Sequence, residues 1–291
     1  YQRINYDTAY IMRPPGRWTI KLRGNLSGAW IRTTGRNGED QYHTEVESDF
    51  RGTLSMAVAY RGLGAAVALN PMKLAGKSQD YELNVNSYSN RFGFDIVFLS
   101  SKTYHGKASM NDEVTPIEKG AIRQQALNVN LYYAFNSKRF SFPAAFSQSY
   151  LQRRSAGSFM VGASFDGQIT DIDANETANQ QPINLKLMEI GIGAGYGYNL
   201  VAGKRWLFHL SLLPTFDFYI HSRLKENGER INLHYRFPSL ITTGRGAAVY
   251  SWRNQFAVAS LIYNYSVVGD RDQLQVRRSK WRVRFTYGFR F

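Results

Sequence analysis

His209 and Ser211 are the residues of this sequence whose types and spacing come closest to a catalytic site. An imidazole that accepts the hydroxyl proton of a serine creates a nucleophile able to cleave esters, provided that a third group orients the imidazole. Asp217 is also odd-numbered and would lie on the same face of a β-strand, but eight residues at about 3.3 Å each separate it from His209. This distance excludes a triad within one strand and leaves a partner on a neighbouring strand open.

The element that holds His209 and Ser211 alternates between apolar and polar residues, and residues 280–291 show the same pattern most clearly. Odd positions there are apolar from Trp281 to Phe291, whereas even positions are polar and mostly cationic. A period of two predicts a β-strand, because successive side chains point to opposite faces. An uninterrupted apolar face opposite a cationic face is typical of a strand between lipid and a wet interior. With this phase, His209 and Ser211 point inward.

Alternation along the chain predicts an all-β fold, a transmembrane antiparallel barrel of about twelve strands. The expected strands are 18–31, 49–60, 64–71, 81–88, 92–105, 125–136, 158–169, 185–200, 206–221, 237–252, 256–268 and 280–291. Connections near 61, 91, 138, 203 and 253 are short, and those at 32–44, 71–80, 106–120, 170–184, 223–232 and 269–276 are long. Bacterial barrels have short periplasmic turns and longer extracellular loops. We therefore expect both termini to be periplasmic.

Composition is consistent with an integral barrel of the bacterial outer membrane. The chain has 291 residues, of which 43% are hydrophobic, and its mean hydropathy is −0.39. It contains no run of about 18 apolar residues, which excludes a transmembrane helix. The absence of cysteine fits passage through an oxidising periplasm. No signal peptide is visible, and we expect that a targeting segment was removed.

The net charge of +14 suggests a lumen that attracts anions or a surface that contacts anionic lipid. Nucleic acid is not expected as a partner, because no aromatic and basic binding module is present. The expected lumen-facing basic residues are Lys21, Arg23, Arg51, Arg245, Lys280, Arg282, Arg284 and Arg290, and the acidic ones are Asp49, Glu82, Asp95, Asp166, Glu189 and Asp217. Pairing of the first and last strands would place Lys280, Arg282 and Arg284 beside Lys21 and Arg23. The alternative to an anion-selective lumen is a network of ion pairs that fills a narrow interior.

Aromatic residues near strand ends predict the girdles found at the two membrane interfaces. The expected girdle residues are Trp18, Trp30, Trp206, Trp281 and Phe291. No metal site or cofactor is expected. Asp171, Asp173 and Asn175 begin like a calcium loop, but Glu176 occupies the glycine position and Pro182 the position of the bidentate glutamate.

Residues 140–155 interrupt the alternation and form the exception in the predicted barrel domain of residues 18–291. An even number of strands is retained if this segment is a plug in the lumen or on the periplasmic side. The inner face of the strand at 185–200 carries glycines from Gly191 to Gly197, which would leave space for the plug. The alternative is that these glycines ease curvature. Residues 1–17 have no clear period and are expected to form an N-terminal periplasmic segment.

Two stretches resemble a known family. W-T-I-K-L-R-G-N at residues 18–25 and F-P-A-A-F-S-Q-S-Y-L-Q-R-R-S-A-G-S at residues 142–158 are similar to a Bacteroidetes family of outer-membrane proteins, domain-of-unknown-function family 4421. The resemblance spans nearly the whole chain. It implies an outer-membrane barrel and brings no established activity or catalytic residues. The terminal Phe291 resembles the signal that the barrel-assembly machinery recognises during biogenesis.

The sequence therefore favours a non-enzymatic, monomeric, porin-like barrel. It would act as a narrow, anion-preferring pore or as a structural barrel that binds an unidentified protein partner, with outer-membrane lipid around it. The alternative is a lipid hydrolase, because His209 and Ser211 resemble the His-x-Ser of the twelve-stranded outer-membrane phospholipases. The inward phase of both residues counts against that alternative, since phospholipase chemistry lies on the lipid-facing side.

Overall fold

The computed structural model describes residues 5–60, 63–69, 80–111, 113–173, 182–226, 229–231, 239–270 and 274–291. In these ranges the chain is almost entirely β-structure, with one short helix. The elements are β1 (Ile11–Met12), β2 (Trp18–Asn37), β3 (Asp40–Glu47), β4 (Arg51–Tyr60), β5 (Leu63–Leu69), β6 (Tyr81–Tyr88), β7 (Phe92–Ser101), β8 (His105–Met110), β9 (Glu113–Ile117), β10 (Ile122–Ala134), α2 (Phe142–Phe146), β11 (Leu151–Gln152), β12 (Ala156–Ile172), β13 (Ile183–Ala202), β14 (Trp206–Glu226), β15 (Glu229–Ile231), β16 (Ser239–Trp252), β17 (Gln255–Asp270) and β18 (Leu274–Arg290).

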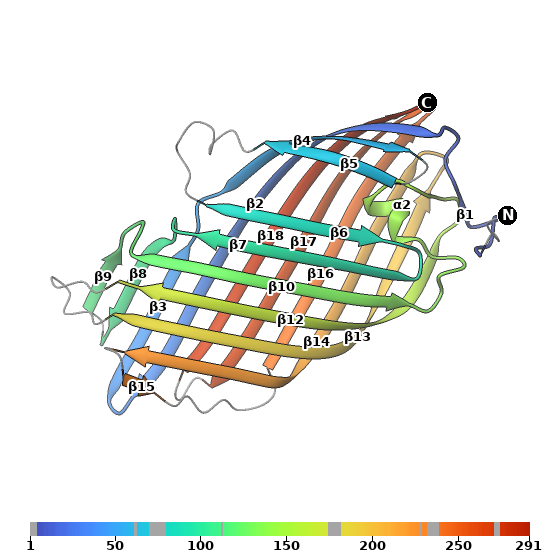
Figure 1. Ribbon diagram of the computed structural model, residues 1–291. Coiled ribbons are helices and arrows are strands. Elements are labelled where there is room, and N and C mark those ends of the chain that lie inside the picture. The colour runs from blue at the N-terminus through green and yellow to red at the C-terminus, as the bar shows by residue number, and fades with distance from the viewer. Residues whose placement is uncertain are drawn as a thin grey trace.

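Sixteen strands form one antiparallel sheet that curls into a half-barrel (Figure 1). Neighbours follow the order β6-β7-β10-β12-β13-β14-β16-β17-β18-β2, and β4 and then β5 continue from β2. The first long strand therefore pairs with the last one, from Thr19 opposite Arg290 to Gly35 opposite Leu274. Among the described strands, β5 and β6 do not pair, although they follow each other in the chain. We call the space enclosed by the curl the lumen.

The outer face of the sheet is apolar and exposed, as the alternation predicts. In β18, the exposed fractions of Phe285, Tyr287 and Phe289 are 62%, 48% and 41%, whereas Arg282 and Arg290 on the inner face are 9% and 3% exposed. This is the inverse of a water-soluble sheet, in which the apolar face is buried against a core. No helix among the described residues is long and apolar enough to cross a membrane.

The expected count of about twelve strands is not confirmed, because the sheet contains sixteen. The additional strands lie in segments expected to be loops. β2 continues to Asn37 and pairs with β3, β8 pairs with β3 and β9, and β15 pairs with the end of β14. Figure 1 places these short strands at the end of the sheet opposite α2. Backbone hydrogen bonds form these hairpins, and their residues do not alternate in polarity, so periodicity missed them.

The expected short connections are present near residues 91, 138, 203 and 253. Ser89 and Phe92 close one turn, Arg139 bonds back to Asn136, and Gly203 and Arg253 have positive φ angles. The expected turn at residue 61, residues 71–79 of the next expected loop and most of the loop at 170–184, including Asn175 and Glu176, fall outside the described residues.

Helix α2 lies inside the curl, at the end where both chain termini also lie (Figure 1). Ser141 caps its N-terminus by accepting a hydrogen bond from Ala144 N (3.3 Å), and Pro143 occupies the first turn, where its missing N–H costs nothing. The N-terminal segment joins the same region, because β1 pairs with β11 just after the helix. We call residues 140–152 the inner segment and this end of the lumen the base.

Two apolar clusters fix the inner segment against the wall. Phe140 and Phe142 pack with Met160 and Leu213, and Ala144 packs in a second cluster that includes Phe256. Within the glycine row, a Cβ on Gly197 would meet Phe140 at 3.1 Å. A Cβ on Gly193 or Gly195 would instead meet the backbone of β14. The inner segment therefore contacts one end of this row, whereas Gly193 and Gly195 permit close approach to the backbone of β14.

Candidate functional site in the lumen

A line of seven cations runs up the inner face of the paired strands β2 and β18. The register places alternate residues of each strand on this face, with Thr286 opposite Arg23 and Arg284 opposite Asn25. From the base upward the cations are Arg290, Lys21, Arg23, Arg284, Arg282, Lys280 and Arg278. We call this line the cation wall. It is the arrangement expected if the first and last strands pair.

In the upper half of the lumen, carboxylates from the opposite strands pair with the arginines of the wall. Arg278 lies 3.2 Å from Asp166 and also forms an ion pair with Glu189, which is fully buried. The same guanidinium donates to Gln168 (2.7 Å) and Ser266 (3.0 Å). Its donors are therefore shared among four acceptors.

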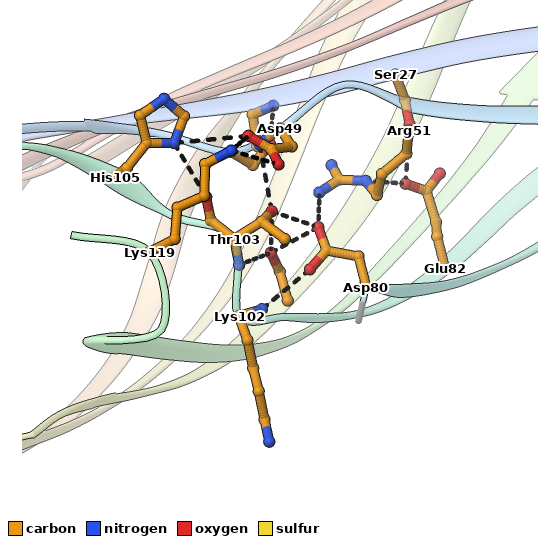
Figure 2. Close-up of polar contacts among 12 residues, drawn as sticks. Ser27, Asp49, Arg51, Asp80, Glu82, Lys102, Thr103, His105 and Lys119 are labelled. Atoms are coloured by element: carbon orange, nitrogen blue, oxygen red, sulfur yellow. Dashed lines mark hydrogen bonds and ion pairs between the residues drawn. The ribbon is translucent and has the colours of Figure 1, made fainter. Parts of the chain in front are cut away.

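A second buried network connects β4 to β6 where these strands are not paired by their backbones. Arg51 lies between Asp80 and Glu82, with nitrogen–oxygen distances of 3.1 Å to each (Figure 2). Asp80 also accepts hydrogen bonds from Ser101 (2.8 Å), Thr103 (2.7 Å) and the backbone N–H of Lys102 (3.0 Å). Glu82 extends the network to Arg282 at 3.6 Å. Side chains thus hold these two edges of the sheet together.

Asp49 does not belong to the lumen wall, contrary to expectation. It lies in the break between β3 and β4, where it pairs with Lys119 at 2.7 Å and lies 3.7 Å from His105 (Figure 2). His105 Nδ1 is 3.1 Å from the carbonyl oxygen of Thr103. In the described part of the chain, no group of three or more His, Cys, Asp or Glu side chains could hold a metal ion.

Midway up the lumen, Arg245 of β16 crosses to Asp95 of β7 at 2.8 Å, and both side chains are buried. Asp95 also accepts a hydrogen bond from Tyr88. Arg245 lies over the ring of Tyr132, 5.4 Å from its centroid. This contact joins opposite walls and narrows the lumen just above the inner segment.

At the base, the cations contact the inner segment instead of carboxylates. Lys21 donates to the carbonyl oxygen of Ser147 (2.6 Å), and Arg290 donates to Gln148 (2.9 Å). Arg284 donates to the amide oxygen of Asn25 (2.6 Å). Among the described residues, none of these three cations, nor Arg23, has a carboxylate within 4.0 Å. The lower half of the cation wall is therefore not neutralised.

His209 and Ser211 lie between the inner segment and the strand wall, together with a third residue that sequence reasoning missed. His209 Nε2 is 3.0 Å from Ser211 Oγ, and His209 Nδ1 is 2.7 Å from Asn199 Oδ1 on the neighbouring strand β13. Asn199 also donates to Ser141 O (2.9 Å) and Gln152 (3.0 Å), so it anchors the inner segment. The rings of Phe142 and Phe146 each lie 5.0 Å from the imidazole. All three polar side chains are at most 4% exposed.

Asp217 lies on the inner face but does not join the His209 group. It is fully buried, and neither carboxylate oxygen has a hydrogen-bond partner among the described residues. In the sheet, Asp217 is paired with Gly191 of β13 on one side and with Ser239 of β16 on the other. The register between β13 and β14 shifts next to this position. The structure thus agrees with the separation from His209 inferred from the sequence.

The expected girdle residues lie on the exposed face, at two levels. Trp18, Trp206 and Phe291 are 44%, 44% and 54% exposed near the base. Trp30 and Trp281 lie higher and are half-buried, with Trp281 against Phe50 and Trp30 donating to Glu45.

Toward the end of the sheet opposite the base, two ionisable groups have shifted pKa values. Hydrogen bonds from Arg32 and then Trp30 lower the pKa of Glu45. Burial raises the pKa of Tyr104. Neither group takes part in the cation wall.

Residues 5–291 match the model of a family described as a domain of unknown function (DUF4421). The chain belongs to this family. The resemblance inferred from residues 18–25 and 142–158 is thereby confirmed, whereas a Bacteroidetes origin stays a prediction. The comparison with curated proteins gives no match.

Among solved structures, this DUF4421 chain is similar to outer-membrane proteins at low identity. The outer membrane protease OmpT from Escherichia coli matches with a TM-score of 0.44 and 8% identity, covering 96% of this chain and 98% of that one. OprG from Pseudomonas aeruginosa matches with a TM-score of 0.31 and 10% identity, covering 95% and 98%. The toluene transporter TodX from P. putida matches with a TM-score of 0.29 and 9% identity, covering 96% and 91%.

Proposed function

We propose that this chain is an integral barrel of the bacterial outer membrane whose base, with both termini, faces the periplasm. The support is the inverted sheet, with exposed apolar side chains outside and charged side chains inside, because only lipid makes such a face favourable. In this proposal the short strands β3, β8, β9 and β15 extend beyond the membrane and the remaining twelve strands of the sheet cross it. The barrel works as a monomer surrounded by outer-membrane lipid and is inserted by the barrel-assembly machinery.

The barrel acts without catalysis as a narrow, anion-preferring pore that the inner segment closes. The observation that carries this proposal is the lower half of the cation wall, where Lys21, Arg23, Arg284 and Arg290 have no carboxylate partner. Cations that served only to fill the interior would be paired, because a buried charge without a counter-charge is costly. A ring or line of unpaired cations in a lumen selects for anions.

Closure by the inner segment follows from its contacts with the same cations. Ser147 and Gln148 accept hydrogen bonds from Lys21 and Arg290, so the segment covers part of the conducting surface. Movement of the inner segment would expose these side chains to water and to anions. A protein partner on the periplasmic side could control this movement.

Planar-bilayer conductance under a salt gradient tests this function. We expect the wild-type protein to be nearly silent and the Phe142→Ala,Phe146→Ala variant to conduct in steady steps with anion preference. Adding Arg23→Glu and Arg284→Glu to the conducting variant should shift the reversal potential toward cation preference. Heat-modifiable migration in electrophoresis would verify that each variant is folded. Silence of the folded double variant would refute the pore.

A second candidate, the lipid hydrolase, is favoured by one observation: Ser211, His209 and Asn199 form a continuous hydrogen-bonded group. In this candidate Ser211 is the nucleophile, His209 the base and Asn199 the group that orients the imidazole. Substrate could reach them only after the inner segment moves, because Phe142 and Phe146 lie against the imidazole. Release of fatty acid from phospholipid vesicles by the Phe142→Ala,Phe146→Ala variant, abolished by Ser211→Ala, would establish it. No release by either protein would eliminate it.

A further inference from the structure

A cavity of about 60 Å³ lies in the upper half of the lumen, well above the inner segment. It is lined by residues of β2, β16, β17 and β18, and by residues of β7, β10, β12 and the connection after β7. Lys280, Arg278, Asn264, Gln124, Asp166 and Tyr104 are among the residues that line it. A water molecule needs only about 10–15 Å³ by this kind of measure, so the cavity has room for a small polyatomic ligand.

The polar groups that remain available around this cavity are mainly donors. Lys280 Nζ is buried and has no hydrogen-bond acceptor among the described residues. The amide oxygen of Asn264 accepts a hydrogen bond from Thr243 (2.9 Å), which leaves its NH₂ group to point elsewhere. The described part of the chain offers no hydrogen bond to the side chain of Gln124, which is 4% exposed.

The charged groups nearest to Lys280 already have partners. Asp166 accepts hydrogen bonds from Arg278 (3.2 Å) and Asn128 (2.6 Å). Glu82 is shared between Arg51 and Arg282. Neither carboxylate lies within 4.0 Å of Lys280 among the ion pairs of the described residues. The carboxylates are thus neutralised and the ammonium is not.

We propose that this cavity binds a small oxyanion, such as inorganic phosphate or a short carboxylate, through Lys280, Asn264 and Gln124. An oxyanion supplies several acceptor oxygens in different directions, which matches donors on three separate strands. It would also provide the missing counter-charge for Lys280. Asp166, the carboxylate among the residues that line the cavity, already accepts hydrogen bonds with both of its oxygens, so the cavity suits an anion better than a cation. Binding here does not require conduction, so the proposal stands apart from pore activity.

Thermal unfolding of the detergent-solubilised protein with inorganic phosphate provides the test, and chloride at equal ionic strength is the comparison. We expect phosphate to raise the unfolding temperature of the wild type in a saturable manner, beyond the effect of chloride. Lys280→Met should weaken the apparent phosphate affinity at least about tenfold, because it removes a charge-assisted contact. Arg277→Met is the matched control, since it removes one cation from the opposite face of the same strand and should retain phosphate binding.

Gln124→Met gives an independent measurement, because it removes one donor and keeps the side-chain length. If Lys280→Met does not fold, weaker phosphate binding by Gln124→Met than by Arg277→Met supports the site. Equal stabilisation of the wild type by phosphate and chloride would overturn the proposal. The proposal would also be overturned if Lys280→Met bound phosphate as tightly as the wild type. If Lys280→Met does not fold, the same holds for Gln124→Met. Phosphate binding by the wild type, together with silence of the folded Phe142→Ala,Phe146→Ala variant in bilayers, would refute the pore while retaining this site.

Discussion

The two halves of the cation wall have the same side chains but different surroundings. In the upper half, Arg278 and Arg282 contact carboxylates from across the lumen, and Arg51 adds a second such network at the seam between β4 and β6. At the base, the side chains of Lys21 and Arg290 donate hydrogen bonds to a carbonyl and an amide of the inner segment. Identical residue types on adjacent strands thus serve two roles.

This difference indicates which half supports the fold and which half can change. A buried Arg–carboxylate network is strongly destabilised when one partner is removed, because the other charges stay buried. A contact between a cation and a neutral oxygen can be exchanged for water at a small net cost. The upper half therefore holds opposite walls together, whereas the base can release the inner segment without breaking ion pairs.

The largest expected effect is the loss of stability in Arg278→Met. This substitution leaves Asp166 and the fully buried Glu189 without their counter-charge and should lower the free energy of unfolding by about 3–5 kcal/mol. Lys21→Met, at the base of the same wall, should change it by no more than about 1.5 kcal/mol. Urea unfolding in lipid vesicles, followed by tryptophan fluorescence, measures both. Equal losses in the two variants would contradict the division into halves.

The next largest effect is expected from Phe142→Ala, which removes a ring packed between Phe140, Tyr132 and His209. Truncation of a buried phenylalanine costs about 3–5 kcal/mol. Here this loss should mainly weaken the docking of the inner segment and should destabilise the barrel less. Limited proteolysis should cleave within residues 140–152 while the strands stay protected. Phe159→Ala is the matched control, because Phe159 is 71% exposed on the outer face and does not contact the inner segment. Cleavage throughout the barrel would show that segment and sheet unfold together.

The sequence was sufficient to predict the features that depend on local alternation. Period two in residues 280–291 agrees with the exposure of Phe285, Tyr287 and Phe289 and with the burial of Arg282 and Arg290, and it placed Lys280, Arg282 and Arg284 on one face. Arg278 lies two residues before the expected strand 280–291 and has the parity of its inner face, so extending that strand would have found it. Asn199 already lies within the expected strand 185–200, with the parity of its inner face. Asp80 lies one residue before the expected strand 81–88 and has the same parity as Glu82, so extending that strand would have placed it on the inner face as well.

Features that depend on distance across the lumen could not be predicted from the sequence. Arg245 and Asp95 are 150 positions apart, and only the curvature of the sheet brings them together. The hairpins around β3 and β8 escaped prediction because backbone pairing there does not require an apolar face. The contact of Asn199 with Ser141 depends on where the inner segment folds. The sequence of residues 140–155 shows only that the polar–apolar alternation is interrupted there, and does not show which strands the segment contacts.

A smaller effect is expected for Asn199→Ala, which tests how the base holds the inner segment. The substitution leaves the carbonyl oxygen of Ser141 and the Nδ1 atom of His209 without partners, and should cost about 1–3 kcal/mol. Ser211→Ala removes a single hydrogen bond from the same group and should cost about 0.5–1.5 kcal/mol. Hydrogen exchange of the amides in residues 140–152 should accelerate more in Asn199→Ala than in Ser211→Ala. The reverse order would argue that Ser211, and not Asn199, anchors the segment.

The smallest effect concerns Glu45, which lies beyond both halves of the wall. Its carboxylate accepts hydrogen bonds from Arg32 (2.7 Å) and Trp30 (3.1 Å), which lower its pKa in the folded protein below the ordinary value of 4.5. A lowered folded pKa contributes stability above the unfolded pKa, and this contribution is lost as the pH falls through the folded pKa. Because the pair is partly exposed, the contribution at neutral pH should be less than about 1 kcal/mol. The difference in free energy of unfolding between wild type and Glu45→Gln should therefore shrink as the pH falls from about 7 to about 3. A difference that stays constant over this range would mean that the carboxylate does not stabilise the β2–β3 hairpin through its charge, and that this extension is held by backbone pairing alone.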